Sequence, residues 1–508
     1  MSDPTFLPIA DFLPDLPSYP APGSANIRNV YPRTKVSYGA VGSPMAQFSA
    51  LNKRCQGAAG YRDSGGNVFL FAGDANDLYA LNVSVSDWAN VSSAPGAYNT
   101  TEEQMWEFVY FNGDVIATNF ADPMQYYNIN TPPAGFADLP GTPPKARHLA
   151  VVKNSFVVAG NTFDAVNGNM PQRVWWCDAG NAHSWSTPGT TAAAAAQAGA
   201  VDLLGDGGWV MGFAPSLANA DAVVFQQYAV RRMVYAGPPV VFDFLPAENA
   251  RGTDASRSIV VQGGIAYYFG QDGFYAFDGS ASQPIGVDKV DKTVLNDIDL
   301  GNLGRMVGAA SPFNNLILWA YPSKGNNGVC NRILVYNWVL QKFDLLDVPC
   351  ETLVRLLGLG YNLDELYTLL GYSIDNVPAS LDSPIWTGGR LSLGLFGTDH
   401  RMAFFSGDPL QATVETSEMA PYPGRRMFVR NTRPLIDGVN SSCTVAIGHR
   451  ERQQDAVTFA QPTTLNSMGL CPARASGRYI TTRVVIPSSN TWTNISGVEV
   501  EGDPMGTR

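Results

Sequence analysis

The stretch WEFVYFNGDVIATNF, residues 106–120, places Asn112-Gly113 between two runs of apolar and aromatic residues. Asn-Gly in that setting is the strongest short signal of a β-hairpin, because both residues accept the positive φ that a tight turn needs. The same pattern recurs in GGIAYYFGQDGFYAFDG, residues 263–279, where Asp272-Gly273 is flanked by aromatics. The sequence therefore predicts short strands joined by tight turns.

Strand-rich segments of this kind follow one another along the chain, and each closes on an aromatic residue followed by a turn. The clearest closing aromatics are Trp88, Phe136, Trp185, Phe242, Phe343 and Trp386. They are 48, 49, 57, 101 and 43 residues apart, so the longest gap is expected to hold two units. A unit of about four short strands cannot bury both of its faces alone, and a period near 50 is typical of a β-propeller blade. We therefore expect six or seven blades.

The composition agrees with an all-β fold. The chain has 508 residues, of which 45% are hydrophobic and 15% charged, and it contains 50 Gly and 35 Pro. Such a profile is typical of many short strands joined by tight turns. The length exceeds one ordinary core, which indicates one large repeat fold with an appendage.

Charge and cysteine usage exclude several classes of protein. The net charge is −11 and the basic residues are scattered, which disfavours sequence-specific DNA binding. The N-terminus has no pattern for export, and no apolar run approaches the roughly 20 residues of a membrane span. Six cysteines without a CxxC motif favour reduced thiols in a cytosolic product and indicate no zinc site.

Changes of texture along the chain predict four regions. Residues 1–50 are rich in Pro and Ser and are expected to form an extended arm that lies across a neighbour, so that its removal would leave the propeller folded. The propeller is expected over 51–347. An irregular linker or insertion over 348–395 closes it, and 396–508 forms a β-rich, sandwich-like platform. The leucine-rich part of the third region is interrupted by glycines, which predicts at most one short helix there.

The chemically versatile residues form no constellation in the sequence. The histidines His148, His183, His400 and His449 have no partner at a metal-ligand spacing. Asp399-His400-Arg401 is disfavoured as a catalytic group, because adjacent residues on a strand point to opposite faces. The pairs Arg231-Arg232 and Arg425-Arg426 could anchor a partner carboxylate, although solvated surface arginine is the commoner case. The sequence thus predicts no catalytic, cofactor-binding or metal-binding residue, and no enzyme.

Several motif fragments are also incomplete. DAND at 74–77 and GQDG at 270–273 lack the full ligand spacing of a calcium loop, and turn chemistry explains both. GDGGWVMG at 205–212 lacks the Lys-Ser/Thr of a phosphate-binding loop. Repeats of the sialidase Asp-box type are absent from the sequence.

Four phrases of the chain resemble the stabilisation or tail-hub (nozzle) proteins of short-tailed bacteriophages (podoviruses). The phrases are residues 263–279 with PIG at 284–286, YSIDNVPASLDSPIWTGG at 372–389, LQATVETSEM at 410–419, and the end of the chain from Ser476. The most specific matches are Asp375, Asp382, Trp386, Gly388-Gly389 and the later Glu415-Thr416 pair. No catalytic residues accompany the resemblance.

The resemblance implies a structural virion protein. In that family a propeller and a β-platform assemble as a homo-oligomeric ring, commonly a hexamer, below the portal and head-to-tail adaptor. Such a ring closes the channel through which double-stranded DNA leaves, and it anchors tail fibres or a plug. The expected location is the virion tail, assembled in the host cytoplasm, without membrane insertion and without a cofactor. An acidic lumen would repel phosphate, so that the genome slides without sticking.

Two alternatives remain open from the sequence. A carbohydrate-binding or carbohydrate-cleaving propeller for host-surface recognition predicts exposed aromatics with carboxylates in the central depression. A host-encoded propeller that serves as a scaffold for protein partners is the other alternative.

Overall fold

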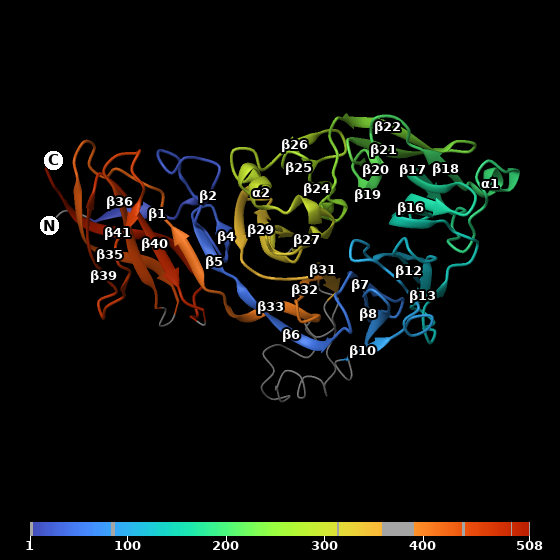
Figure 1. Cartoon of the computed structure of the whole chain (residues 1–508), viewed down its shortest axis with the longest axis horizontal. Coiled ribbons are helices and arrows are strands. Elements are labelled where there is room, and N and C mark those ends of the chain that lie inside the picture. The colour runs from blue at the N-terminus through green and yellow to red at the C-terminus, as the bar shows by residue number, and fades with distance from the viewer. Residues whose placement is uncertain are drawn as a thin grey trace.

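The computed structural model describes residues 4–82, 87–311, 314–357, 391–438, 442–488 and 490–506. Strands provide nearly all of the regular structure in these ranges, and they form two bodies that lie side by side along the long axis of the molecule (Figure 1). The larger body is a β-propeller and the smaller one is a pair of packed sheets, which we call the platform.

The propeller consists of seven four-stranded antiparallel sheets within the described ranges. The first two blades are β7 (Gly57–Arg62), β8 (Val68–Gly73), β9 (Leu78–Asn82) and β10 (Asp87–Asn90), then β11 (Glu107–Phe111), β12 (Asp114–Thr118), β13 (Gln125–Asn128) and β14 (Ala137–Asp138). The third and fourth are β15 (Lys145–Val152), β16 (Phe156–Asp164), β17 (Gly168–Trp176) and β18 (Gly199–Asp202), then β19 (Val210–Leu217), β20 (Ala220–Gln226), β21 (Ala229–Gly237) and β22 (Val241–Asn249). Between β17 and β18 lies the short helix α1 (Thr191–Ala196).

The last three blades complete the ring. The fifth is β23 (Val260–Gln262), β24 (Ile265–Phe269), β25 (Phe274–Phe277) and β26 (Ser282–Pro284), and the helix α2 (Asp291–Asp297) follows it. The sixth is β27 (Val307–Ser311), β28 (Leu316–Pro322), β29 (Cys330–Asn337) and β30 (Lys342–Leu346). The seventh combines β31 (Thr352–Leu357), β32 (Leu391–Phe396) and β33 (Arg401–Pro409) with β6 (Gly42–Ala50) from the N-terminal region.

The ring closes in two ways. Each inner strand contacts the next one around the axis, and the inner strand β31 of the seventh blade contacts β7 of the first. The outer strand β6 pairs with β33 and leads directly into the first blade, so the seventh blade contains strands from both ends of the propeller sequence. Phe48 of β6 packs with Leu70, Trp88 and Phe396 in a core shared by the first and seventh blades. A propeller closed in this way leaves little exposed sheet edge.

The platform consists of two packed sheets. One has six strands, namely β1 (Thr5–Pro8), β4 (Val30–Thr34), β5 (Ser37–Ala40), β35 (Met427–Asp437), β39 (Cys471–Gly477) and β41 (Asn494–Pro504). The other has five, namely β34 (Ala412–Glu415), β36 (Thr444–Arg450), β37 (Thr458–Phe459), β38 (Thr463–Thr464) and β40 (Tyr479–Ile486). Val429 and Val498 of the first sheet lie in one buried core with Val445 and Val484 of the second, so the platform is sandwich-like.

The N-terminal segment joins the two bodies. After β1 it forms a small parallel ladder of β2 (Asp11–Phe12) and β3 (Gly23–Ser24). Asp11 forms an ion pair of 2.5 Å with Lys342 of β30. The Asp15 carboxylate accepts hydrogen bonds of 2.8 Å from the backbone N–H groups of Lys292 and Thr293, in the first turn of α2. The same buried core runs from the platform into the fifth and sixth blades.

The structure confirms the all-β fold class, with a β-propeller and a sandwich-like platform, and gives seven as the number of blades. Asn112 and Gly113 both have positive φ, at 49° and 96°, in the turn between β11 and β12. The propeller, predicted over 51–347, continues to Pro409, and the segment predicted as an irregular linker contributes β31 and most of β32 to the seventh blade. Residues 358–390, which include most of the leucine-rich region and Asp375, Asp382 and Trp386, lie outside the described residues.

The segment expected to be an extended arm differs most from the expectation. Instead of lying across a neighbour, residues 5–50 pair with strands of the same chain in both bodies. The sequence did not reveal these strands, because β1, β5 and β6 pair with segments hundreds of residues away, and the local pairs β2–β3 and β4–β5 are short. Non-local pairing of this kind leaves no signal in local periodicity.

Asp291, at the start of α2, is a buried carboxyl that makes stability depend on pH. It is 5% exposed and accepts a hydrogen bond of 3.1 Å from the Phe274 N–H. A Cβ at Gly286 would overlap its carboxylate, so the chain closes tightly around it. Burial raises the pKa of Asp291 to about 6, and the nearby Asp15 and Asp272 raise it further while the Phe274 N–H lowers it. The folded state therefore binds this proton more tightly than the unfolded state, in which the carboxyl keeps its ordinary pKa of 3.8.

We expect the contribution of Asp291 to stability to be present below pH 4 and lost as the pH rises through about 6. The variant Asp291→Asn keeps a carbonyl oxygen for the Phe274 N–H and removes the buried charge. It should raise the free energy of unfolding at pH 7.5 by about 1–3 kcal/mol and flatten the change between pH 4 and 7. Urea unfolding across this pH range measures the effect, with Asp206→Asn on an exposed loop as the matched control. An equal pH dependence in wild type and Asp291→Asn would contradict it.

Candidate functional sites

One cavity of the described structure lies on the propeller axis and has a volume of about 560 Å³. All seven blades contribute to its lining through their inner strands or the loops that lead into them. The lining is concentrated near the first residues of most of these strands, which places the cavity towards the end of the axis where the inner strands start. Its volume lies within the usual range for small-molecule pockets.

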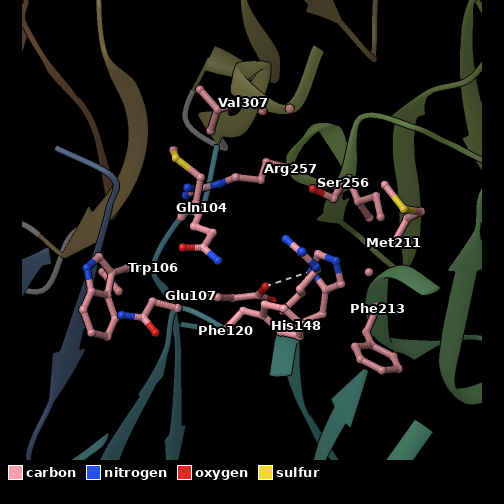
Figure 2. Close-up of a pocket in the computed structure, with 18 of the residues that line it drawn as sticks. Gln104, Trp106, Glu107, Phe120, His148, Met211, Phe213, Ser256, Arg257 and Val307 are labelled. Atoms are coloured by element: carbon pink, nitrogen blue, oxygen red, sulfur yellow. Dashed lines mark hydrogen bonds and ion pairs between the residues drawn. The ribbon is translucent and has the colours of Figure 1, made fainter. Parts of the chain in front are cut away.

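Polar groups from three blades project into this cavity. Figure 2 shows Gln104, Glu107 and Arg257 directed towards one hollow, with His148 beside Glu107. The His148 Nδ1 atom lies 3.2 Å from the Glu107 carboxylate. The Gln104 carbonyl oxygen accepts a hydrogen bond of 3.0 Å from the Thr101 N–H, which turns its NH₂ group away from that contact. The acid in the hollow is thus held by a histidine, and Gln104 offers a donor.

Two arginines of the cavity have few partners of their own. Arg257 donates one hydrogen bond of 2.9 Å, to the backbone carbonyl of Gln56. The Arg147 guanidinium lies over the Phe120 ring, 4.1 Å from its centroid, and no carboxylate among the described residues forms an ion pair with it. Burial lowers the pKa of both guanidinium groups, and Glu107 partly offsets this for Arg257. Both remain charged, because an arginine pKa starts above 12.

A second concentration of buried polar groups lies where the N-terminal segment meets the platform; we call it the clamp. Glu415, at the end of β34, has a side chain that is 7% exposed. Its carboxylate accepts hydrogen bonds of 2.6 Å from Arg483 of β40 and of 2.6 Å from Ser24. Asn26 also donates to it, at 3.1 Å. One carboxylate therefore ties the N-terminal segment to the platform sheet.

The clamp has a second carboxylate three residues further on. Glu418 is nearly buried and accepts two hydrogen bonds from the Arg450 guanidinium, of 2.6 Å from Nε and 2.5 Å from a terminal nitrogen. Ser18 donates to the same carboxylate at 3.0 Å. Between the two acids, Thr416 accepts a hydrogen bond of 2.9 Å from the Thr482 N–H through its hydroxyl. Bidentate arginine–carboxylate pairs fix geometry as well as adding energy.

The clamp coincides with one of the phrases that carried the phage resemblance. Glu415-Thr416, singled out in LQATVETSEM, provides two of its polar side chains, and β40 and β41 come from the final phrase. Residues 263–279 form the β24–β25 hairpin of the fifth blade. The phrase at 372–389 lies outside the described residues. The other phrases therefore fall on the platform and on the blade beside it.

The histidines are used in pairs with acids. His148 pairs with Glu107, His183 lies 2.7 Å from Asp114, and His400 lies 2.5 Å from Glu351. Each contact joins residues 41, 69 or 49 positions apart, so local spacing gave no sign of them. Alignment of the second and third repeats could have paired Glu107 with His148, because each residue lies near the start of the inner strand of its blade. His449 lies on β36, opposite Ile480 of β40.

The other candidates have local roles. Asp399 and His400 lie in the turn between β32 and β33 rather than on a strand, and the Asp399 carboxylate accepts a hydrogen bond from the Arg401 N–H at 3.2 Å. Arg231 donates to Gln226 at 2.8 Å, and Arg426 forms an ion pair of 2.7 Å with Glu451.

Metal-binding clusters and membrane-spanning helices are both absent from the described residues. They contain no group of three or more His, Cys, Asp or Glu side chains in a metal-binding arrangement. None of their helices is both long enough and apolar enough to cross a membrane. All six cysteines are buried as free thiols.

No protein-family model and no curated protein sequence matches the chain. Among solved structures, it is similar to BamB from Moraxella catarrhalis, with 10% identity over 74% of this chain and 92% of that chain and a TM-score of 0.35. A putative 6-phosphogluconolactonase from Bacteroides uniformis is 11% identical over 68% and 98%, with a TM-score of 0.38. The dihydro-heme d1 dehydrogenase NirN is 12% identical over 86% and 79%, with a TM-score of 0.36. Likeness at this level carries no argument about function.

Proposed function

We propose that this chain is a structural component of the tail of a short-tailed bacteriophage. Copies of the chain would form a nozzle or hub ring below the portal and adaptor, commonly of six subunits. The observation that carries the proposal is the union of a propeller and a β-platform in one chain, with Glu415-Thr416 at their N-terminal joint. This is the architecture that the resemblance implied, and the motif residues lie in its clamp.

The clamp supports a load-transmitting role. A ring through which a genome leaves needs subunits in which the propeller and the platform keep a fixed position relative to each other. Here the N-terminal segment contributes strands to both bodies, and Asp15 and Asp11 attach it to α2 and β30. Since rigid interfaces between copies also require rigid subunits, this construction suits closed ring assembly.

The mechanism of such a ring is steric and electrostatic. Interfaces between copies above about 2,000 Å² would seal the channel, as in other obligate assemblies. The net charge of −11 favours a surface that repels phosphate, so that double-stranded DNA passes without binding. Fibres or a plug would attach to the outer part of the ring.

The copy number of the chain in purified phage particles tests the proposal. Quantitative mass spectrometry should find it in a fixed ratio to the portal protein from one particle preparation to the next, with the ratio of the major capsid protein to the portal protein as the control. Absence of the chain from particles of a phage that encodes it would contradict a virion role.

A second candidate is a carbohydrate-binding or carbohydrate-cleaving propeller, and one observation favours it. Trp209 lines the axial cavity with 49% of its surface exposed, and Asp254 and Glu107 line the same cavity. An exposed aromatic ring beside carboxylates is the arrangement that this alternative predicts. Retention of the isolated monomer on a glycan array would favour it over the ring.

A further inference from the structure

The axial cavity has more hydrogen-bond donors than the protein uses. Several donor side chains line it, among them Gln104, His148, the exposed Arg355, and the two arginines with few partners, Arg147 and Arg257. The two guanidinium groups carry ten N–H hydrogens between them by their chemistry. Within the described residues, Arg257 donates one hydrogen bond to a backbone carbonyl. The contact found for Arg147 is with the face of the Phe120 ring. A buried or half-buried cation with so few partners is costly unless something compensates it.

The acids of the cavity supply only part of that compensation, since the charge of Glu107 acts on Arg257 without forming an ion pair with it. Glu107 is held by His148 at 3.2 Å. Asp254 accepts hydrogen bonds from the amides of Gln227 and Gln271, at 3.1 and 3.4 Å. Glu103, at the rim, lies 3.9 Å from Arg305. Each carboxylate thus has its own partner, and none forms an ion pair with Arg147 or Arg257 within the described residues.

We propose that the axial cavity is a binding site for a compact oxyanion, a carboxylate or phosphate group carried on a small molecule. Arg257 would bind the anion from one side, together with the Gln104 NH₂ group that faces the same hollow (Figure 2). Arg147 would bind it from the third blade, with its guanidinium plane held flat by Phe120. Planar guanidinium groups present parallel donors that match the two oxygens of a carboxylate or phosphate.

The cavity also limits what can carry the anion. A volume of about 560 Å³ accommodates a small organic acid or a sugar acid. Met211, Phe213 and Tyr61 add apolar surface to the lining, which suits a ligand with a carbon framework better than a bare ion. This site is independent of the proposed ring, because it is built within one subunit.

Isothermal titration calorimetry of the full-length chain tests this inference. The probes are inorganic phosphate, glucuronate and neutral glucose, at constant ionic strength set with sodium chloride. We expect phosphate or glucuronate to bind and glucose not to bind. Phosphate alone would assign a phosphate-bearing ligand, and glucuronate alone a carboxylate-bearing one. If neither anion bound at 10 mM, or if glucose bound equally well, the proposal would be overturned.

Variants place the anion in the cavity. Arg147→Gln and Arg257→Gln should each weaken binding by about tenfold to a hundredfold, as expected for lost hydrogen bonds to a charged group. Arg147→Lys keeps the positive charge but loses the parallel N–H donors of the guanidinium group. Its affinity for the anion should therefore lie between those of wild type and Arg147→Gln. Arg474→Gln, on an exposed position of β39 in the platform, is the matched control and should bind as wild type does. If Arg257→Gln fails to fold, the result for Arg147→Gln tests the assignment alone. Anion affinity equal to wild type in Arg147→Gln would overturn the assignment.

Discussion

A chain that begins at residue 51 is expected to lose the folded state of both bodies. The deletion removes β6, the outer strand of the seventh blade, and β1, β4 and β5 of the six-stranded platform sheet. It also removes eight large buried side chains, namely Leu7, Ile9, Phe12, Ile27, Val30, Tyr38, Val41 and Phe48. At about 1.5–3 kcal/mol for each buried side chain, the loss is about 12–24 kcal/mol, which is as large as or larger than the roughly 5–15 kcal/mol that usually separates folded from unfolded states.

Solubility and thermal unfolding of the 51–508 chain measure this effect. We expect aggregation, or a broad transition far below that of the full chain. A peptide of residues 1–50 added during refolding is the control, and it should restore part of the cooperative transition because strand pairing can occur in trans. A 51–508 chain with a wild-type transition would show that the N-terminal strands are dispensable, as the sequence alone had suggested.

Replacing Glu415 by alanine is expected to have the second largest effect. The substitution leaves Arg483, Ser24 and Asn26 without their shared acceptor. Removing one partner of a buried, hydrogen-bonded ion pair costs about 3–5 kcal/mol, and the partial exposure of Arg483 places the expected loss nearer 2–4 kcal/mol. Glu415→Gln retains an acceptor oxygen and should lose roughly half as much.

Chemical denaturation of the full chain checks the clamp, with Glu499→Ala as the matched control. Glu499 forms an ion pair of 3.4 Å with Arg433 on the platform surface, where Arg433 is exposed and Glu499 is partly exposed. Pairs of that kind contribute less than about 1 kcal/mol. Limited proteolysis should also release the N-terminal segment faster from Glu415→Ala. Equal stabilities of Glu415→Ala and Glu499→Ala would show that the clamp does not hold the N-terminal segment.

The blades could be predicted from the sequence because their signals are local. Turn residues such as Asn112-Gly113 lie between apolar runs, and the closing aromatics Trp88, Phe242 and Phe343 lie on the fourth strands of their blades. The prediction therefore needed no information about which segments meet across the chain. Local turn chemistry and a period near 50 residues were sufficient.

The closure of the propeller and the composition of the platform could not be predicted in this way. β6 pairs with β33 across more than 350 residues, and its sequence GSPMAQFSA has no clear alternation of polar and apolar residues. The same applies to β1 and β41, which lie at opposite ends of the chain. These pairings are set by the tertiary fold, so a proline-rich segment was predicted to be an arm when it is a structural strand region.

The candidate sites also combine residues that the sequence singled out with contacts that only the tertiary fold creates. The resemblance singled out Glu415-Thr416, but their role emerged only when Ser24 and Asn26 were found beside them. The axial cavity takes a small group of residues from each blade, so its arginines and its Glu107–His148 pair form no recognisable motif in any one repeat. A site distributed over a ring of repeats becomes visible only when the repeats are arranged around their axis.

Electron cryomicroscopy of the purified full-length chain, alone and in the intact particle, tests the central claim most directly. We expect a closed ring of subunits, each with a seven-bladed propeller and a platform, around a channel wide enough for duplex DNA at the tail exit. The Glu415→Ala variant should show fewer complete rings under the same conditions. A monodisperse monomer that is absent from the tail would contradict the nozzle proposal and favour the carbohydrate-binding propeller.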